Sequence, residues 1–156
     1  MAISVRLARP EDAEAVRRVG DEAFATVRQL YHPSPAAHAN LSTMAPALER
    51  LVAEDGGEVV GAVRFGNFDD CLRVIGLAVL PQSRRRGVAR ALIQQLAGVA
   101  RNRGCRALAL YTVTKTGNVA IFQRLGFAVV SEQPDAYSIS VDGEPLTAAY
   151  MERTVA

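Results

Sequence analysis

The chain has 156 residues, of which 49% are hydrophobic, and its formal net charge is +2 at pH 7. This length predicts one domain, spanning residues 1–156, with a substantial buried core, and the composition excludes an intrinsically disordered chain. The small net charge argues against a globally basic nucleic-acid binder, although one basic cluster stands at Arg84–Arg86.

Cysteine usage and the N-terminal residues bound the expected setting of the protein. Cys71 and Cys105 show neither metal-ligand spacing nor a disulfide framework, so we expect two reduced, buried thiols and no metal site. The chain starts without a signal-peptide pattern, and no apolar run approaches the ~20 residues of a membrane span. These features predict a soluble, cytoplasmic protein with no membrane partner.

The first third of the chain alternates between clear and weak patterns. Alternating apolar residues predict a strand over Ile3–Leu7, and Pro10 then fits the first turn of a helix that runs to about Arg28. The segment 31–40 contains two prolines and both histidines and indicates a loop. A second helix is predicted over 36–51, bent near its proline. This segment is the expected wall of a substrate pocket.

The middle of the chain predicts three antiparallel strands followed by a helix. Residues 51–54 and 58–65 form a strand–turn–strand pattern, and a further turn leads to a strand over 71–79. The helix opened by Gly87 carries an apolar face and ends at a glycine after Arg103.

The last third begins with an apolar run over 105–113, which is typical of a central strand covered on both faces. Because it follows a helical crossover, this strand is expected to lie parallel to the 71–79 strand. A short helix over 118–125, a strand from 127 to 131, a hairpin-type turn at Asp142-Gly143 and a last strand over 146–153 complete the chain.

Two motifs carry the functional argument. Leu77-Ala78-Val79-Leu80-Pro81 ends a buried strand, and Arg84-Arg85-Arg86-Gly87-Val88-Ala89 follows as the turn that opens a helix. A helix start offers unpaired backbone N–H groups and a positive dipole end, which suit a phosphate group. The second motif is Asn118-Val119-Ala120-Ile121-Phe122-Gln123-Arg124-Leu125-Gly126-Phe127.

With these two motifs in place, and with Val5–Asp12 as a weaker opening signal, the chain resembles the GNAT-type N-acetyltransferase superfamily over nearly its whole length. The resemblance implies an α/β (α+β) fold, the acyl-CoA N-acyltransferase fold. This is a single domain with a mixed, mostly antiparallel sheet of six to seven strands and about four flanking helices. The family's fourth and fifth strands are parallel and splayed.

The resemblance implies acetyl-CoA as co-substrate, and the residues supply a physical basis for it. The backbone N–H groups of Arg85, Arg86, Gly87, Val88 and Ala89 can converge on a pyrophosphate, and the side chains of Arg84, Arg85 and Arg86 suit the 3′-phosphate. By similarity, Leu77, Ala78 and Val79 line the pantetheine arm, and the Val79 N–H is the expected donor to the thioester carbonyl. Asn118 and Phe122 complete the cofactor-binding set.

Simpler interpretations remain beside these assignments. The arginine turn can be a solvated basic cap on a strand, or a nucleic-acid patch, although it lacks interleaved aromatic residues. Asn118 can serve as a helix N-cap, and Phe122 as an ordinary core aromatic residue.

The catalytic groups are harder to assign. Many family members have tyrosine as the acid where this chain has Phe122, so Tyr111 is the alternative acid, with Tyr137 and Tyr150 as further candidates. The candidates for the general base are Glu54, Asp69 and Asp70, together with His32 and His38.

The expected function is acetyl transfer from acetyl-CoA to a primary amine, by direct attack in a ternary complex. The acceptor is a small molecule or a peptide, no nucleic-acid partner is expected, and a homodimer stays open. A non-catalytic acyl-CoA-binding module is the main alternative, because Phe122 has no proton to donate. A basic RNA-facing protein is a third hypothesis.

Overall fold

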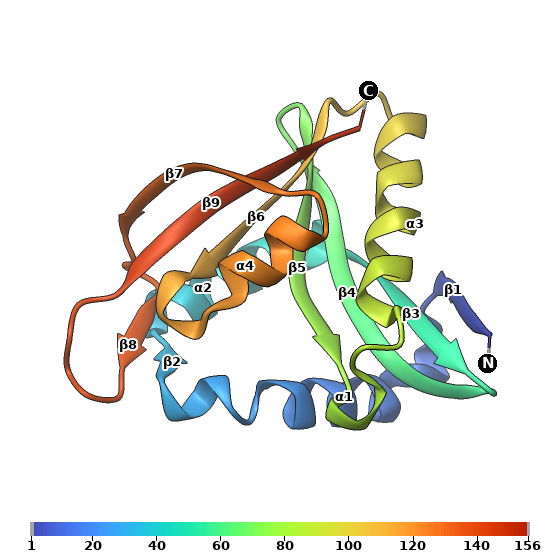
Figure 1. Ribbon diagram of the computed structural model, residues 1–156, viewed down its shortest axis with the longest axis horizontal. Helices are drawn as coiled ribbons and strands as arrows, with labels where there is room; N and C mark the ends of the chain where they lie inside the picture. Colours follow the sequence, from blue (N-terminus) through green and yellow to red (C-terminus); the bar gives the residue numbers. More distant parts are fainter. Residues whose placement is uncertain (1, 156) are drawn as a thin grey trace.

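The computed structural model describes residues 2–155, which fold as a single mixed α/β domain around one sheet. Seven strands lie in the order β1-β3-β4-β5-β6-β9-β7 (Figure 1), and every neighbouring pair is antiparallel except β5 and β6. The strands are β1 (Ile3–Leu7), β3 (Glu49–Asp55), β4 (Glu58–Phe68), β5 (Cys71–Val79), β6 (Ala107–Val113), β7 (Ala128–Pro134) and β9 (Thr147–Thr154). The expected fold class is confirmed.

The helices cover both faces of this sheet. They are α1 (Ala13–Phe24), α2 (Pro35–Met44), α3 (Val88–Asn102) and α4 (Asn118–Arg124). A Cβ added to Gly61 of β4 would meet the side chains of Val88 and Leu92, so this side of β4 faces α3. The next residue, Ala62, points to the other face, where it lines a cavity together with α1. Helices α1 and α3 therefore lie on opposite faces.

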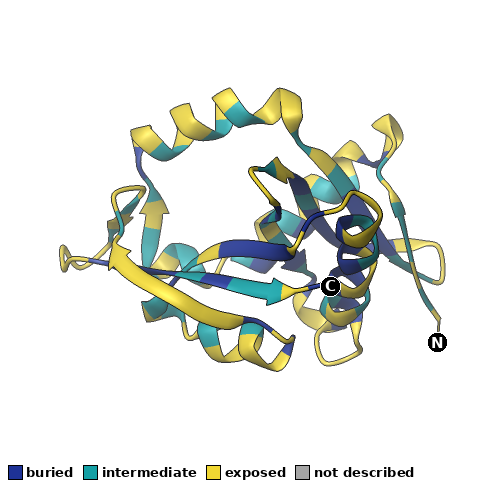
Figure 2. Ribbon diagram, turned by 90° about the horizontal axis from the view of Figure 1, so that it is seen from above, coloured by how far each residue is buried: buried dark blue, intermediate teal, exposed yellow. Residues whose placement is uncertain are grey.

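The core follows from the apolar periods of the sequence. On α3, the buried residues recur at helical spacing: Val88, Leu92, Ile93, Leu96, Ala97 and Ala100. The first four residues of β6 are buried, as expected for a central strand, whereas β7 at the edge is exposed along its whole length (Figure 2). None of the helices within residues 2–155 is long and apolar enough to cross a membrane.

The N-terminal third differs from the sequence-based expectation. Residues 10–12 form a 3₁₀ turn, and α1 ends at Phe24 instead of Arg28. The predicted loop at 31–40 contains the short strand β2 (Tyr31–Pro33) and the start of α2, which Ser34 caps by accepting from the Ala37 N–H at 3.2 Å.

The second helix, predicted over 36–51, extends too far, because α2 ends at Met44. After α2, residues 45–47 form a 3₁₀ turn around Pro46, and residues 49–51 belong to β3. Proline cannot continue the helical hydrogen bonding, and β3 gains a ladder on each side from β1 and β4. Arg50 consequently lies in the sheet.

The C-terminal third holds one further correction. The turn at Asp142-Gly143 exists, with Gly143 at a φ of 79°, but it does not join two paired strands. The preceding strand β8 (Ser138–Ser140) pairs with β2 in a separate two-stranded sheet. Its partner lies about a hundred residues earlier in the chain, so no local pattern predicts it.

Candidate active site

Strands β5 and β6 are paired at one end and open at the other. Their parallel ladder covers only Cys71–Arg73 against Ala107–Ala109, and the strands diverge toward their C-terminal ends (Figure 1). On its other side, β5 has a register shift against β4 where Gly76 adopts a φ of 64°. Such a bulge bends the strand away from its neighbour. The splay expected between these two strands is present.

The backbone of Val79 faces the open side of β5. Leu80 donates its N–H to the carbonyl oxygen of Val60 on β4 at 2.9 Å, and Val79 stands opposite Gly61 in the same antiparallel ladder. Hydrogen-bonded and non-hydrogen-bonded pairs alternate in such a ladder, so the Val79 N–H points away from β4. It is directed into the gap between β5 and β6.

The start of α3 has the form of an anion site. Gly87 is its N-cap, with a φ of 82° and open space around the position of a Cβ, and Ala91 donates the first intrahelical bond to its carbonyl at 2.9 Å. The N–H groups of Val88 and Ala89 in the first turn therefore have no intrahelical acceptor. Together with the dipole of a 15-residue helix, they favour an anion.

The three arginines of this turn differ in their surroundings. Arg84 donates from Nη2 to the Ala23 carbonyl at the end of α1, at 3.2 Å, and so ties the turn to α1. Arg86 lies 4.0 Å from Asp55 at the end of β3. Arg85 is exposed and has a φ of 62°. The guanidinium of Arg85 is thus the one best placed to reach a ligand from solvent.

The Asn118 side chain does not cap α4. Gly117 is the N-cap, at a φ of 79°, and the Asn118 backbone N–H donates to the Thr116 hydroxyl at 3.2 Å. The capping alternative is therefore wrong, and within residues 2–155 the Asn118 side chain makes no hydrogen bond. Phe122, one turn further on, packs edge-on against Phe127 with ring centroids 5.8 Å apart.

The candidate tyrosines have different environments. Tyr111 on β6 is 50% exposed, and its ring lies 4.9 Å from that of Tyr150 on β9. Tyr150 donates its hydroxyl to Glu152 at 2.6 Å, and burial together with this carboxylate raises the pKa of the phenol. Tyr137 is exposed in the segment before β8.

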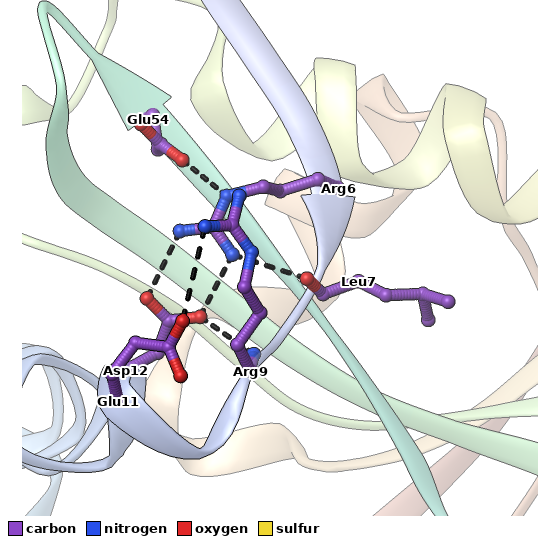
Figure 3. Close-up of polar contacts among 6 residues, drawn as sticks. All are labelled: Arg6, Leu7, Arg9, Glu11, Asp12 and Glu54. Carbon is purple, nitrogen blue, oxygen red and sulfur yellow. Dashed lines mark hydrogen bonds and ion pairs between the residues drawn. The ribbon is translucent and has the colours of Figure 1, made fainter.

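The carboxylates expected as bases lie away from the splay. Figure 3 shows Arg6 of β1 placed between Glu54 of β3 and Asp12, with which it forms ion pairs. Asp70 pairs with Arg106 at 2.7 Å, which lowers the pKa of this carboxyl, and Asp69 occupies the turn between β4 and β5. That turn is at the paired end of β5.

The histidines and cysteines differ in their exposure. His32 on β2 and His38 on α2 are both exposed. Cys71 and Cys105 are free and buried, and burial raises the pKa of the Cys71 thiol. In the part of the chain that the structure describes, no group of three His, Cys, Asp or Glu side chains is arranged to hold a metal ion.

A cavity of about 440 Å³ opens beside the bulge of β5. Gly76 and Ala78 of β5 form one wall and α1 forms another. The remaining lining residues are Val16, Arg17, Gly20, Asp21, Phe24, Arg28, Arg50, Ala62, Val63 and Arg64. Sequence reasoning missed its charged members, although Arg64 interrupts an apolar strand and so gave a signal.

Comparisons with known proteins agree with this fold. Residues 16–127 match the model of the acetyltransferase (GNAT) family, whereas no match is found among curated proteins. Among solved structures, the ribosomal-protein-S18-alanine N-acetyltransferase from Escherichia coli superposes with a TM-score of 0.77 at 19% identity, over 99% of this chain and 95% of the other. An N-acetyltransferase from Staphylococcus aureus Mu50 gives 0.77 at 20% identity, with both chains fully covered.

A third similar structure is the ribosomal-protein-alanine N-acetyltransferase from Brucella melitensis, with a TM-score of 0.74 at 20% identity, over 97% of this chain and 99% of the other. At identities of 19–20%, these structural similarities support the fold alone. The family match covers more than half of the sequence and includes the splayed strands and the start of α3. The chain therefore belongs to the GNAT acetyltransferase family and is an acyltransferase.

Proposed function

We propose that residues 1–156 act as one N-acetyltransferase domain, which transfers an acetyl group from acetyl-CoA to a primary amine by direct attack in a ternary complex. The observation that carries the proposal is that three features lie next to the C-terminal half of β5, in the chain or as its neighbours in space. These are the open start of α3, the gap between β5 and β6, and the cavity beside the bulge.

These three features assign parts of the co-substrate to named residues. The N–H groups of Gly87, Val88 and Ala89 receive the pyrophosphate, and the exposed Arg85 adds a cation for the 3′-phosphate. The pantetheine arm fills the gap along β5, where Leu77, Ala78 and Val79 present backbone groups. Asn118, whose side chain is uncommitted within residues 2–155, contacts the same arm from α4.

The chemistry then needs little beyond positioning. The lone pair of the neutral amine attacks the thioester carbon, an N–C bond forms, and the C–S bond breaks to release the CoA thiolate. The Val79 N–H donates to the carbonyl oxygen as it gains negative charge. The amine loses one proton to a base and the thiolate gains one.

The acid is assigned to Tyr111, because Phe122 has no hydroxyl and the Tyr150 hydroxyl is held by Glu152. Tyr111 lies on β6 two residues beyond the last pair with β5, on the part of β6 where the two strands diverge. A thiol with a pKa of ~8.5 is already a tolerable leaving group, so a modest acid suffices.

We assign the ammonium contact to Asp21. Of the described residues that line the cavity, it is the single carboxylate, and it stands 4.0 Å from Arg17 on the same helix. Glu54 is not retained as the base, because its carboxylate is occupied by Arg6 on the far side of β4 from the splay.

The alternative is a non-catalytic acyl-CoA-binding module, which Phe122 favours. The two functions differ in turnover. Incubation with acetyl-CoA and a broad panel of amines should release CoA thiol together with an equal amount of acetylated amine, detected by mass spectrometry. Tight acetyl-CoA binding without product over the whole panel would instead establish the binding module.

A further inference from the structure

The cavity between α1 and the bulge of β5, in which the proposed function places the acceptor, is strongly cationic. Four arginines line it, Arg17, Arg28, Arg50 and Arg64, against one carboxylate. This carboxylate belongs to Asp21, which lies 4.0 Å from Arg17. Over residues 2–155, Arg28, Arg50 and Arg64 form no ion pair, so the cavity keeps an excess of positive charge.

Arg28 is held in place without an acidic partner. Its guanidinium carbon lies 5.8 Å from the ring centroid of Phe24 and 5.4 Å from that of Tyr31. Its Nη1 atom is buried and has no hydrogen-bond partner in the described chain. Buried donors are normally satisfied, so this N–H group can serve an acceptor on a bound ligand.

Arg50 and Arg64 add a second unfavourable feature. They stand directly opposite each other on β3 and β4, and both line the cavity. Like charges at such a position destabilise a sheet. The pKa of Arg64 is lowered mainly by burial and to a smaller extent by the positive charge of Arg50. An oxyanion between the two guanidinium groups would relieve both effects.

The location ties this charge to the transfer reaction. Gly76 and Ala78 line the cavity and flank the bulge next to Val79, whose N–H faces the splay. The cavity of about 440 Å³ therefore holds the arginines and also adjoins β5 beside Val79, where the proposed function places the thioester. A polycationic amine would be repelled there.

We propose that the acceptor is an anionic amine, a small molecule whose carboxylate or phosphate group binds Arg28, Arg50 and Arg64 while its amine lies toward Val79. This inference rests on the proposed function and names its substrate class. Planar guanidinium groups bind both carboxylate and phosphate with paired hydrogen bonds. The two sources of the oxyanion are separated by experiment.

The first test compares acceptors that differ only in charge. The pairs are glycine with glycinamide, and O-phosphoethanolamine with ethanolamine, with spermidine as the polycation. The anionic member of at least one pair should have a kcat/KM about 10-fold or more above that of its neutral partner. The pair that shows the preference identifies carboxylate or phosphate. Equal use of both members of each pair, or a preference for spermidine, would overturn the inference while leaving acetyl transfer intact.

The second test does not need catalysis. Succinate and inorganic phosphate are titrated into the wild-type protein and into Arg64→Met, which keeps a similar aliphatic stem and leaves α3 unchanged. At least one anion should raise the melting temperature of the wild type, and this rise should shrink in Arg64→Met. Arg101→Met, which removes an exposed arginine of α3, is the matched control and should respond like the wild type.

An equal response of all three proteins would contradict the anion site, because the shared response would come from elsewhere, such as the start of α3. Absence of any acetylated product combined with an Arg64-dependent anion response would count against the proposed acetyl transfer and not against the anion site. The two proposals therefore fail in different ways.

Discussion

Arg50 and Arg64 face each other directly across the antiparallel pair β3 and β4, and both line the cavity beside the splayed strands. No carboxylate in residues 2–155 forms an ion pair with either. Two cations in register are unfavourable for the sheet. This pair therefore lowers the stability of the sheet at the cavity where we propose that the acceptor binds.

This relationship predicts that removing one of the two charges stabilises the protein. Arg64→Met should raise the urea midpoint at low salt by the equivalent of roughly 0.2–1 kcal/mol, because a like-charge pair is lost while the aliphatic stem remains. Arg101→Met should leave the midpoint close to that of the wild type. A lower midpoint for Arg64→Met, at unchanged slope, would show that the pair does not repel.

Tyr111 and Tyr150 form a matched pair for testing the acid. Tyr111→Phe should lower kcat by about 10²-fold, as loss of a general acid does. Tyr150→Phe should leave kcat nearly unchanged, because the Tyr150 hydroxyl is already donated to Glu152. Steady-state kinetics with a saturating acceptor measure both values. Equal effects of the two substitutions would remove Tyr111 from the role of acid.

Asp21 is expected to hold the ammonium group of the acceptor. Asp21→Asn should raise the KM of the acceptor by roughly 10-fold and leave the KM of acetyl-CoA unchanged, because a charged hydrogen-bond partner is lost at one site only. Glu14→Gln, an exposed carboxylate on the same helix, serves as control. If both KM values rise together in Asp21→Asn, the carboxylate acts on the fold and not on the acceptor.

The Asp12 cluster predicts a pH dependence of stability. Arg6 donates to both carboxylate oxygens at 2.7 and 2.9 Å, and the Arg9 N–H donates at 2.7 Å (Figure 3). These bonds, with those from Arg6 contributing most, lower the pKa of Asp12. A depressed pKa adds stability above the unfolded value of about 3.9 and loses it as the pH falls below that value.

The wild type should therefore lose stability steeply in acid. Asp12→Asn should be less stable than the wild type at neutral pH and should approach it as the pH falls toward the folded pKa of Asp12. Glu11→Gln removes the exposed neighbouring carboxylate and should follow the wild-type curve. Urea unfolding at a series of pH values measures all three curves, and parallel curves for the wild type and Asp12→Asn would contradict the account.

Local patterns predicted the elements that pack on their own apolar period. The spacing of Val88, Leu92 and Leu96, followed by Gly104 at a φ of 73°, correctly marked α3 from start to end. The apolar run of β6 correctly indicated a central strand. In these segments, propensity and burial agree.

Where pairing between distant segments determines the secondary structure, the sequence predicted it less well. Tyr31 pairs with Ser140, and neither segment carries a strand pattern of its own. Arg50 falls within the helix predicted over 36–51, whereas the structure pairs it with Arg64 of β4 in the sheet. The position of Arg50 opposite Arg64 depends on the register between β3 and β4 and could therefore not be predicted from the sequence.

The site shows the same division. The glycine turn at Gly87 was predictable because a tight turn and a helix start leave a local signature. The general base was not predictable. The apolar run before Glu54 correctly indicates a strand, but it does not reveal that Arg6 binds the Glu54 carboxylate. Side-chain partners from distant segments decide which carboxylates stay available.

The central claim, that the start of α3 holds the pyrophosphate of acetyl-CoA, is tested most directly by calorimetric titration of acetyl-CoA into two glycine variants. Gly87→Glu places an anion at the helix start, and Gly104→Glu makes the same change at its end. Both glycines have positive φ and open space around them, so the backbone strain is matched. The account predicts binding at roughly micromolar concentration or tighter for the wild type and Gly104→Glu, and none for a folded Gly87→Glu. Unchanged binding by Gly87→Glu would contradict it.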